Sequence, residues 1–282
     1  MQKTKQRGSG RVIRLALWFY RTFGYFSFFI LLYPITFIYY IKAANVKRAL
    51  KLYYKQIGVK YTRWRYFEHL RKFAVVMTDR FISKCDPQSY SIIIDRQEAI
   101  KHVKDGAIMI FSHFGGWSVA AEFSQETNLR VTVIMKEVIK SDIKAVEAKL
   151  CQNTTNVKIV DLTQTSVIDA SVIIAKAILN KEIIAMMGDR ANNPKHAIKA
   201  EFFGREAEFN KTPFEISKKS KLPIVVFFST YIKPRVYKAD FLKINPEESI
   251  EDMLKQYTKA YEDIIKKNPD QWFNLYDFWA ES

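Results

Sequence analysis

The chain has 282 residues, of which 48% are hydrophobic and 26% charged, a composition that supports a sizeable core and excludes an intrinsically disordered protein. Its net charge of +16 requires anionic partners, such as nucleic acid, an anionic membrane surface or an acidic substrate. The two cysteines, Cys85 and Cys151, are too few and too far apart to suggest a disulfide framework or a zinc site.

The N-terminal region joins a basic segment to an apolar one. Residues 24–41 read GYFSFFILLYPITFIYYI and carry no charge, and as a helix they are about long enough to cross a bilayer. The preceding segment has no acidic residue, and its basic residues are Lys3, Lys5, Arg7, Arg11, Arg14 and Arg21. A basic flank beside an apolar segment is typical of a membrane anchor, so residues 1–44 are predicted to form one.

The arrangement of this anchor stays open. Lys42, Lys47 and Arg48 follow the apolar run, so positive charge flanks both of its ends. A single span, a kinked or re-entrant helix with both flanks cytoplasmic, and a buried helix of a soluble protein are the three alternatives. A cleavable signal peptide is disfavoured, since no small-residue cleavage site follows the run. Pro34, in the middle of the run, is predicted to kink or split the helix.

Residues 45–83 are predicted to be helical, with Lys and Arg between apolar residues that recur at helical spacing. One such series is Tyr66, Leu70, Phe73, Met77 and Phe81. Residues 45–86 are therefore expected to form a helical layer of a second domain that covers residues 45–282.

After Pro87, short apolar runs alternate with helical patterns. The runs predict buried strands at Ala107–Ser112, Val131–Met135, Val157–Val160, Ile183–Met187 and Ile224–Ser229. Helices are predicted at 117–125, 139–151, 165–180, 212–220 and 254–267. This alternation predicts an α/β fold with a central mixed, partly parallel sheet flanked by helices.

The segment SHFGGW directly follows the first predicted strand. It places His113 at the carboxyl end of that strand, where open α/β sheets bind their ligands. A histidine there can take a proton from an attacking hydroxyl or amine. Gly115 and Gly116 permit a tight turn and a close approach of substrate to the backbone, and Trp117 begins the next helix. A structural histidine at a strand end is the alternative.

The segment GDR follows the predicted strand at Ile183–Met187. Asp189 is a candidate to orient His113 and stabilise its charge, and Arg190 is a candidate to bind a phosphate group. A surface Asp–Arg pair that caps a loop is the alternative interpretation.

The segment EFFGREAEFNKTPFEIS predicts a turn, a polar hairpin and the start of a helix. Phe203, Gly204 and Arg205 form the turn and are candidates for one wall of a substrate cleft. Thr212 and Pro213 belong to the same candidate wall, although helix capping alone explains both, with Thr212 as the N-cap.

In this order, SHFGGW, MGDR and EFFGREAEF…TPFEISKKSKLPIV resemble blocks of the lysophospholipid acyltransferase superfamily. The similarity is greatest to its bacterial lipid A secondary acyltransferase branch, of the lauroyl and myristoyl type. The ending NPDQWFNLYDFW is similar to predicted acyltransferases of aryl polyene and related lipid pathways. The resemblance covers roughly residues 10–282 and includes LRKF…TDRF at Leu70–Phe81.

The resemblance implies a catalytic site with a His and, five positions later, an Asp or Glu. His113 matches the His, but Ser118 stands in the acidic position. Either Ser118 supports the base through a water, or another carboxylate replaces it, with Asp189 the first candidate and Glu122 the second. The remaining alternative is a lipid-binding or scaffolding relative that has lost acyl transfer.

The resemblance also implies a function and a location. The expected reaction is direct acyl transfer from acyl carrier protein or acyl-CoA to a hydroxyl or amine of a lipid or glycolipid, with amides around Gly115 and Gly116 or the Arg190 side chain stabilising the oxyanion. Neither a metal nor a bound cofactor is expected. Expected partners are membrane lipid and an acidic acyl carrier protein, not nucleic acid, at the cytoplasmic face of a bacterial inner membrane.

Overall fold

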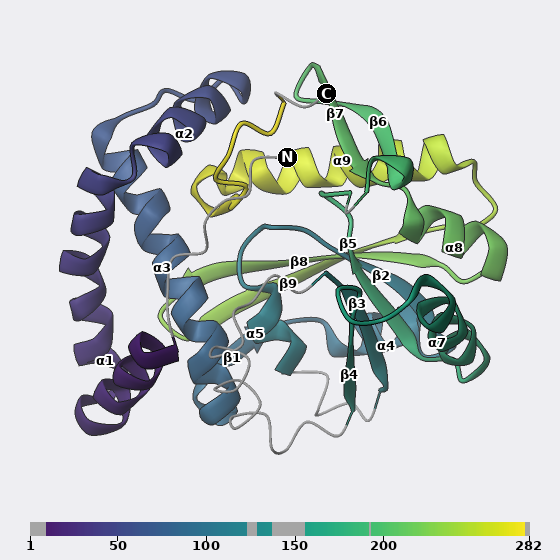
Figure 1. The fold of residues 1–282 in the computed structure, drawn as a ribbon, viewed down its shortest axis with the longest axis horizontal. Helices are drawn as coiled ribbons and strands as arrows, with labels where there is room; N and C mark the ends of the chain where they lie inside the picture. Colours follow the sequence, from purple (N-terminus) through teal and green to yellow (C-terminus); the bar gives the residue numbers. More distant parts are fainter. Residues whose placement is uncertain (1–9, 123–128, 137–155, 192, 280–282) are drawn as a thin grey trace.

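The computed structural model describes residues 10–122, 129–136, 156–191 and 193–279, and one large sheet lies at its centre (Figure 1). The strand order is β1-β9-β8-β2-β5-β3-β4. Their bounds are β1 Ser91–Ile93, β2 Ala107–Phe111, β3 Val131–Met135, β4 Val157–Asp161, β5 Ile183–Met187, β8 Ile224–Lys233 and β9 Val236–Ile244. The strands from β8 to β4 are parallel to one another, β9 is antiparallel to β8, and β1 is parallel to β9. The predicted mixed, partly parallel sheet is confirmed.

The central strands are apolar on both faces because helices cover both sides of the sheet. On one face, Ile108 and Ile110 of β2 pack in a cluster with α7, α8 and α9. On the other face, Ala107 and Phe111 share a cluster with α4 and α5. The helix bounds are α4 Arg96–Val103, α5 Trp117–Glu122, α7 Val167–Leu179, α8 Thr212–Ser220 and α9 Ile250–Lys267.

Most predicted elements lie within a residue or two of their observed bounds. Strand β8 is longer than predicted. Strands β1 and β9 were not predicted, because β1 has only three residues and β9 mixes charged with apolar residues. Helix α9 begins earlier than predicted, since Ser249 accepts a hydrogen bond at its start from the Asp252 amide (3.0 Å). The predicted helix at 139–151 lies outside the described residues. A separate antiparallel hairpin, β6 Ala197–Phe202 and β7 Arg205–Asn210, connects β5 to α8.

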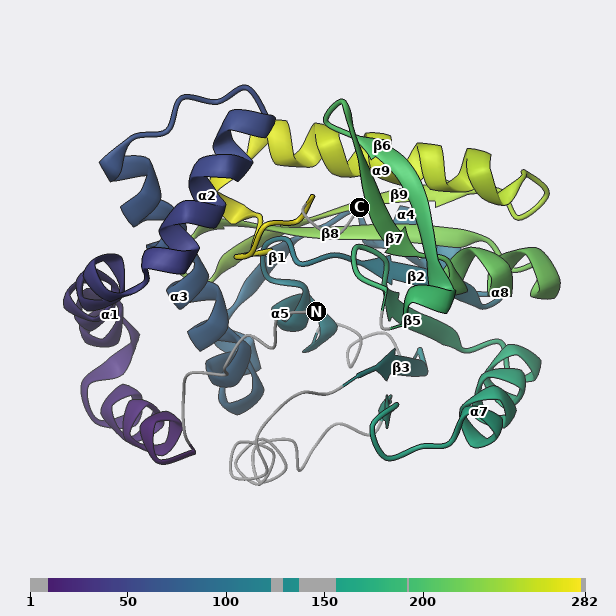
Figure 2. The ribbon, with the colours of Figure 1, turned by 45° about the horizontal axis from the view of Figure 1, so that its top comes forward.

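Three N-terminal helices lie at one end of the sheet, α1 Gly10–Lys42, α2 Ala44–Gln56 and α3 Arg63–Cys85. Figures 1 and 2 show α1 and α3 side by side, with α3 between α1 and the sheet. Residues Ile13–Lys42 of α1 are long and apolar enough to cross a membrane, with a mean hydropathy of 1.6.

The break in α1 is at Gly24, and the helix is not split at Pro34, which was one of the two predicted effects of that proline. Gly24 has φ 77° and ψ 174°, and the helix continues through Pro34. Glycine has no Cβ and adopts a positive φ at little cost, so the chain bends there.

A buried carboxylate joins these helices to the sheet. Asp79 of α3 is 1% exposed and accepts hydrogen bonds from the hydroxyls of Tyr25 (3.1 Å), Tyr90 (2.8 Å) and Tyr237 (2.5 Å). Burial raises the pKa of Asp79 to about 6, and the three hydroxyls and the charge of Arg235 oppose the rise only in part.

Asp79→Asn is expected to make the stability of the protein less dependent on pH. Because the pKa of Asp79 is higher in the folded than in the unfolded chain, its contribution is complete below the unfolded pKa and is lost as the pH rises through the folded pKa. The loss between about pH 4 and pH 7 is roughly 2 kcal/mol in wild type and absent from the variant. Denaturant titrations in mild detergent at the two pH values measure it, and equal pH dependence of the two proteins would contradict the assignment.

Candidate functional site

The parallel pairing of β2 and β5 sets His113 opposite Asp189. Phe111 pairs with Met187 at the ends of the two strands, and the Gly188 amide donates to the Phe111 carbonyl (2.8 Å). Two residues further along each chain, the same register reaches His113 and Asp189. Both side chains therefore emerge at the carboxyl edge of the sheet, as the sequence predicts for a ligand site.

Asp189 holds both the ring and the backbone of His113. The distance from His113 Nδ1 to Asp189 Oδ1 is 2.9 Å, and the His113 amide donates to Oδ2 (2.8 Å). An ionised carboxylate only accepts hydrogen bonds, so Nδ1 carries the proton of the neutral ring and Nε2 has a free lone pair. The His113 side chain is 28% exposed whereas Asp189 is fully buried, so the dyad presents the basic nitrogen outward.

Two further side chains complete the surroundings of Asp189. Its Oδ2 accepts hydrogen bonds from the Tyr261 hydroxyl of α9 (3.1 Å) and from Asn274 Nδ2 (2.9 Å). Burial alone would raise the pKa of Asp189, but the charge and hydrogen bond of His113, the charge of Arg190 and the Asn274 hydrogen bond together hold it well below its usual range. Asp189 is therefore ionised throughout the neutral range.

Arg190 lies beside the dyad and is positioned by two contacts. Its Nε donates to Asn274 Oδ1 (2.6 Å), and its guanidinium lies 4.8 Å from the centre of the Tyr276 ring. Asn274 thus connects Arg190 to Asp189. Among the described residues, Arg190 makes these contacts through Nε and the face of its guanidinium, so its Nη groups are candidates to bind an anionic ligand.

The glycines of SHFGGW allow the His113 loop to pack closely against the rest of the protein. Gly115 has a φ of +53°, and a Cβ there would lie 1.8 Å from the Ser229 carbonyl oxygen. The Gly115 amide donates to the Gln271 carbonyl (2.9 Å) and the Gly116 amide to the Ser229 carbonyl (2.8 Å). Both amides therefore donate hydrogen bonds within the protein, which argues against the expectation that they stabilise an oxyanion. Arg190 remains a candidate for that role.

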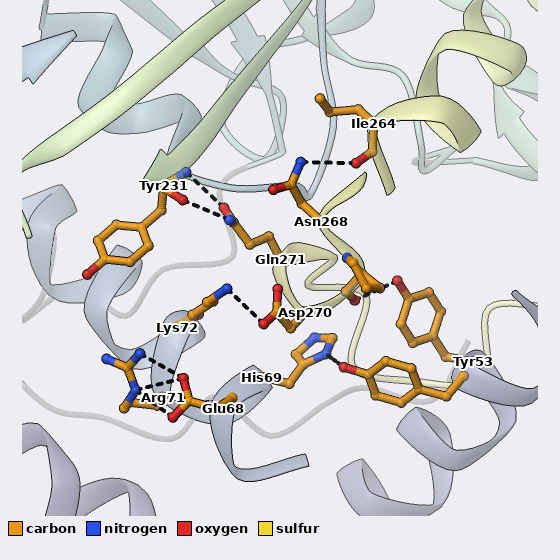
Figure 3. Close-up of polar contacts among 12 residues, drawn as sticks. Tyr53, Glu68, His69, Arg71, Lys72, Tyr231, Ile264, Asn268, Asp270 and Gln271 are labelled. Carbon is orange, nitrogen blue, oxygen red and sulfur yellow. Dashed lines mark hydrogen bonds and ion pairs between the residues drawn. The ribbon is translucent and has the colours of Figure 1, made fainter. Parts of the chain in front are cut away.

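A C-terminal segment, residues 268–274, pairs with the His113 loop and anchors it. The Phe273 amide donates to the His113 carbonyl (2.7 Å). The Gln271 side chain accepts from the Tyr231 amide and donates to its carbonyl, both at 2.8 Å, as Figure 3 shows. The same figure shows the Lys72–Asp270 ion pair (2.7 Å), which fixes the segment to α3.

A buried histidine of α3 holds the same segment. His69 Nε2 lies 2.7 Å from the Trp272 carbonyl oxygen, which can only accept, so Nε2 donates and Nδ1 accepts from the Tyr54 hydroxyl (2.8 Å). Burial lowers the pKa of His69 to about 4, so this histidine is neutral at physiological pH. Its two nitrogens are both used, which makes its role structural.

An apolar cavity extends beneath the His113 loop, on the sheet face that α4 covers. Its lining includes Phe111 and Trp117, whose rings stack at 5.6 Å, and also Val131, Ile183 and Phe227. Ile183 begins β5 and precedes Asp189 by six residues, or about 20 Å of strand. The cavity therefore runs from the residues next to His113 along most of the sheet, with the length and apolar walls that suit a hydrocarbon chain.

The structure separates the candidate partners of His113. Ser118 is buried in α5, and none of the described contacts of the His113 ring involves it. Glu122 ends α5, and its side chain lies outside the described part of the structure. Asp189 is the carboxylate in contact with His113 among the described residues.

The hairpin residues lie away from the dyad. Phe203 and Gly204 form the tip between β6 and β7, where the Phe203 amide donates to Glu262 of α9 (2.6 Å) and its carbonyl accepts from Gln56 of α2 (2.8 Å). Arg205 follows the tip as the exposed first residue of β7.

The base of the hairpin is the part that approaches the GDR loop, because the Asn210 amide donates to the Gly188 carbonyl (2.9 Å). The prediction that Thr212 is the N-cap of α8 is wrong, because Thr212 is the first residue of the helix. Its amide donates a hydrogen bond to Asn210 Oδ1 (3.1 Å). Pro213 follows within the first turn, where its missing N–H costs nothing.

Sequence reasoning missed Tyr261, Gln271 and Asn274. Tyr261 has the helical spacing of a core residue, and the last two belong to the NPDQWFN block that carries the resemblance, which was the available signal. Among the described residues no group of three or more His, Cys, Asp or Glu side chains could hold a metal ion. Cys85 forms no disulfide with a described residue, and Cys151 lies outside the described residues.

Comparison with known proteins gives one family. Residues 69–280 match the family model described as bacterial lipid A biosynthesis acyltransferase. A search of the curated proteins found no match. The matched region begins within α3 and includes the His113–Asp189 dyad, the hairpin and the C-terminal segment.

Proposed function

Because the chain belongs to the bacterial lipid A biosynthesis acyltransferase family, we propose that it transfers a fatty acyl group from a thioester donor to a hydroxyl of a lipid or glycolipid. The single observation that assigns this function to particular residues is the His113–Asp189 pair, with 2.9 Å between Nδ1 and Oδ1. Phe111 and Trp117, which lie on either side of His113 in the sequence, line an apolar cavity that suits the acyl chain.

In the proposed mechanism His113 Nε2 accepts the proton of the acceptor hydroxyl as its oxygen attacks the thioester carbonyl. The new ester C–O bond forms, the C–S bond breaks, and the proton passes from the imidazolium to the departing thiolate. Buried Asp189 stabilises the imidazolium while the proton is held there. The Arg190 guanidinium is the proposed donor to the oxyanion or to a phosphate of the donor.

The dyad also bears on the presence of Ser118 at the position where the resemblance implies an acidic residue. The lost acidic position suggested a relative that binds lipid without catalysis, but Asp189 supplies a buried, ionised carboxylate to the same histidine. We therefore favour the enzyme over the scaffold, with Asp189 as the partner of His113.

The charge of the protein supports the proposed donor and place of action. A net charge of +16 favours an acidic acyl carrier protein over neutral partners and attracts the protein to anionic lipid. We place the reaction at the cytoplasmic face of the inner membrane. Offering the same labelled acyl group on acyl carrier protein and on CoA, with a membrane lipid extract as acceptor, tests the donor. Failure to label lipid from either donor would count against the function.

Val131→Phe is expected to shift transfer toward shorter acyl chains. Val131 lines the end of the cavity remote from His113, and a phenyl ring there would occupy the space of the last methylenes. Preference for shorter over longer donors should rise at least about 10-fold, since one methylene in an apolar pocket is worth that much. Mass spectrometry of the acylated product measures it.

Ile159→Phe is the matched control, because Ile159 is 53% exposed on the neighbouring strand β4 and outside the cavity lining. If both variants keep the wild-type chain preference, the acyl chain does not bind in this cavity.

A further inference from the structure

Helix α1 is apolar on the side that faces away from the protein. Leu17, Phe28 and Leu32 are buried against α3. The opposite side forms a lipid-facing stripe, whose members and exposed fractions are Leu15 63%, Trp18 57%, Phe26 73%, Ile30 53%, Phe37 54% and Ile41 65%. A surface helix of a soluble domain carries polar residues on its outer side, so this stripe requires an apolar environment.

The packing of α1 fixes its orientation relative to the domain. The helix runs antiparallel along α3, from the Tyr20–Asp86 hydrogen bond (2.6 Å) to the Tyr40–Tyr66 ring contact (5.1 Å). Between these ends, Tyr25 donates to Asp79. These contacts place residues 20–40 of α1 along residues 66–86 of α3. Figure 1 shows the two helices side by side.

Charged groups lie level with the middle of α1. The Arg71 guanidinium, paired with Glu68 at 2.7 Å (Figure 3), lies 5.6 Å from the Phe29 ring centre and 5.3 Å from that of Tyr33. On its other side α3 packs on the catalytic domain, for example through the Phe73–Phe273 contact (5.3 Å). A perpendicular span would carry these charges and the edge of the domain to the centre of the bilayer, where charged groups are strongly disfavoured.

We infer that α1 lies in the plane of the membrane interface, with its lipid-facing stripe inserted in one leaflet and both of its ends on the same side. Basic residues at both ends fit an anionic headgroup layer, and they include Arg11, Arg14, Lys42, Lys47 and Arg48. The break at Gly24 lets the two parts of the helix follow the surface of α3.

This orientation sets the distance of the dyad from the leaflet. The His113 carbonyl accepts a hydrogen bond from the Phe273 amide, and Phe273 packs on α3, so the two helices α3 and α1 separate the site from the lipid-facing stripe. The inference concerns membrane geometry and does not require that acyl transfer occurs.

Spin labels at two positions of the stripe test the inference. Ile30→Cys and Ile41→Cys lie on the same continuous part of α1, after the Gly24 break, and both side chains point away from the protein. Each is introduced into a Cys85→Ser, Cys151→Ser background and bound to vesicles that contain anionic lipid. Accessibility to oxygen and to a water-soluble nickel complex then gives the depth of each label. A label at exposed Lys259 of α9 is the reference for water.

In-plane insertion predicts similar depths for the two labels, about 5–10 Å into the headgroup boundary. A span predicts that the label at residue 30 lies near the centre of the bilayer and the label at residue 41 near its edge, because Ile30 is close to the middle of the apolar run 24–41 and 11 residues of helix rise about 16 Å. A large difference, or two labels as accessible to nickel as the Lys259 reference, would overturn the inference. Circular dichroism equal to that of wild type establishes that each variant is folded.

Discussion

His113→Ala is expected to lower the rate of acyl transfer by roughly 10²–10⁴-fold, the usual contribution of a positioned general base. The imidazole is the group of the dyad with a free basic nitrogen, and alanine offers no replacement. The backbone contacts of the residue, its amide to Asp189 and its carbonyl to Phe273, are kept, so the loop should stay folded. Initial rates with a labelled acyl donor measure the effect.

His113→Gln is the matched control for this result, since it keeps a polar side chain of similar size without a basic nitrogen. Both variants should lose activity equally and bind donor and vesicles as wild type does. Retention of more than about a tenth of the wild-type rate by either one would remove His113 from the role of base.

Asp189→Asn is expected to lower the rate of acyl transfer by as much as His113→Ala does, and to lower the stability of the protein as well. Its amide would donate to His113 Nδ1 and leave the proton on Nε2, the wrong tautomer, which costs up to about 10⁴-fold in a comparable histidine–aspartate pair. The donors that surround the carboxylate, Tyr261 and Asn274 among them, would also compete for a single oxygen, at about 1–3 kcal/mol.

The pH dependence of stability checks the same variant. The pKa of Asp189 is lower in the folded than in the unfolded chain, so its stabilising contribution is present above the unfolded pKa and is lost as the pH falls through the folded pKa. Wild type should therefore lose more stability than Asp189→Asn on acidification. Asn274→Ala removes one hydrogen-bond donor to Asp189 but keeps the charge of the carboxylate. It should reduce the rate of acyl transfer far less than Asp189→Asn does. Equal losses of rate in the two variants would contradict the proposed role of the carboxylate.

The site was predictable to the extent that it depends on strand ends. Apolar runs located β2 and β5, and parallel strands that end together bring His113 and Asp189 to one edge. The sequence left Asp189, Glu122 and Ser118 open as partners, because spacing along the chain does not give the register between two strands that are 76 residues apart.

The remaining parts of the site depend on contacts that sequence patterns do not encode. Asn274 meets Asp189 across 85 residues, and Tyr261 meets it across 72. Gly115 fits a close approach to Ser229, a fact visible only once β8 lies beside the loop. The break at Gly24 was not predicted for a similar reason, since local propensity does not show which residue must bend around α3.

The most direct test of the account follows both products of the reaction at once. Purified wild-type protein in anionic vesicles is given an acyl carrier protein thioester with a labelled acyl group, and the free carrier thiol and the labelled lipid ester are quantified together. The account predicts that the two appear in equal amounts and that neither appears with His113→Ala. Release of thiol with labelled free fatty acid and no lipid ester, or no consumption of thioester by folded, vesicle-bound protein, would contradict the assignment of acyl transfer to this site.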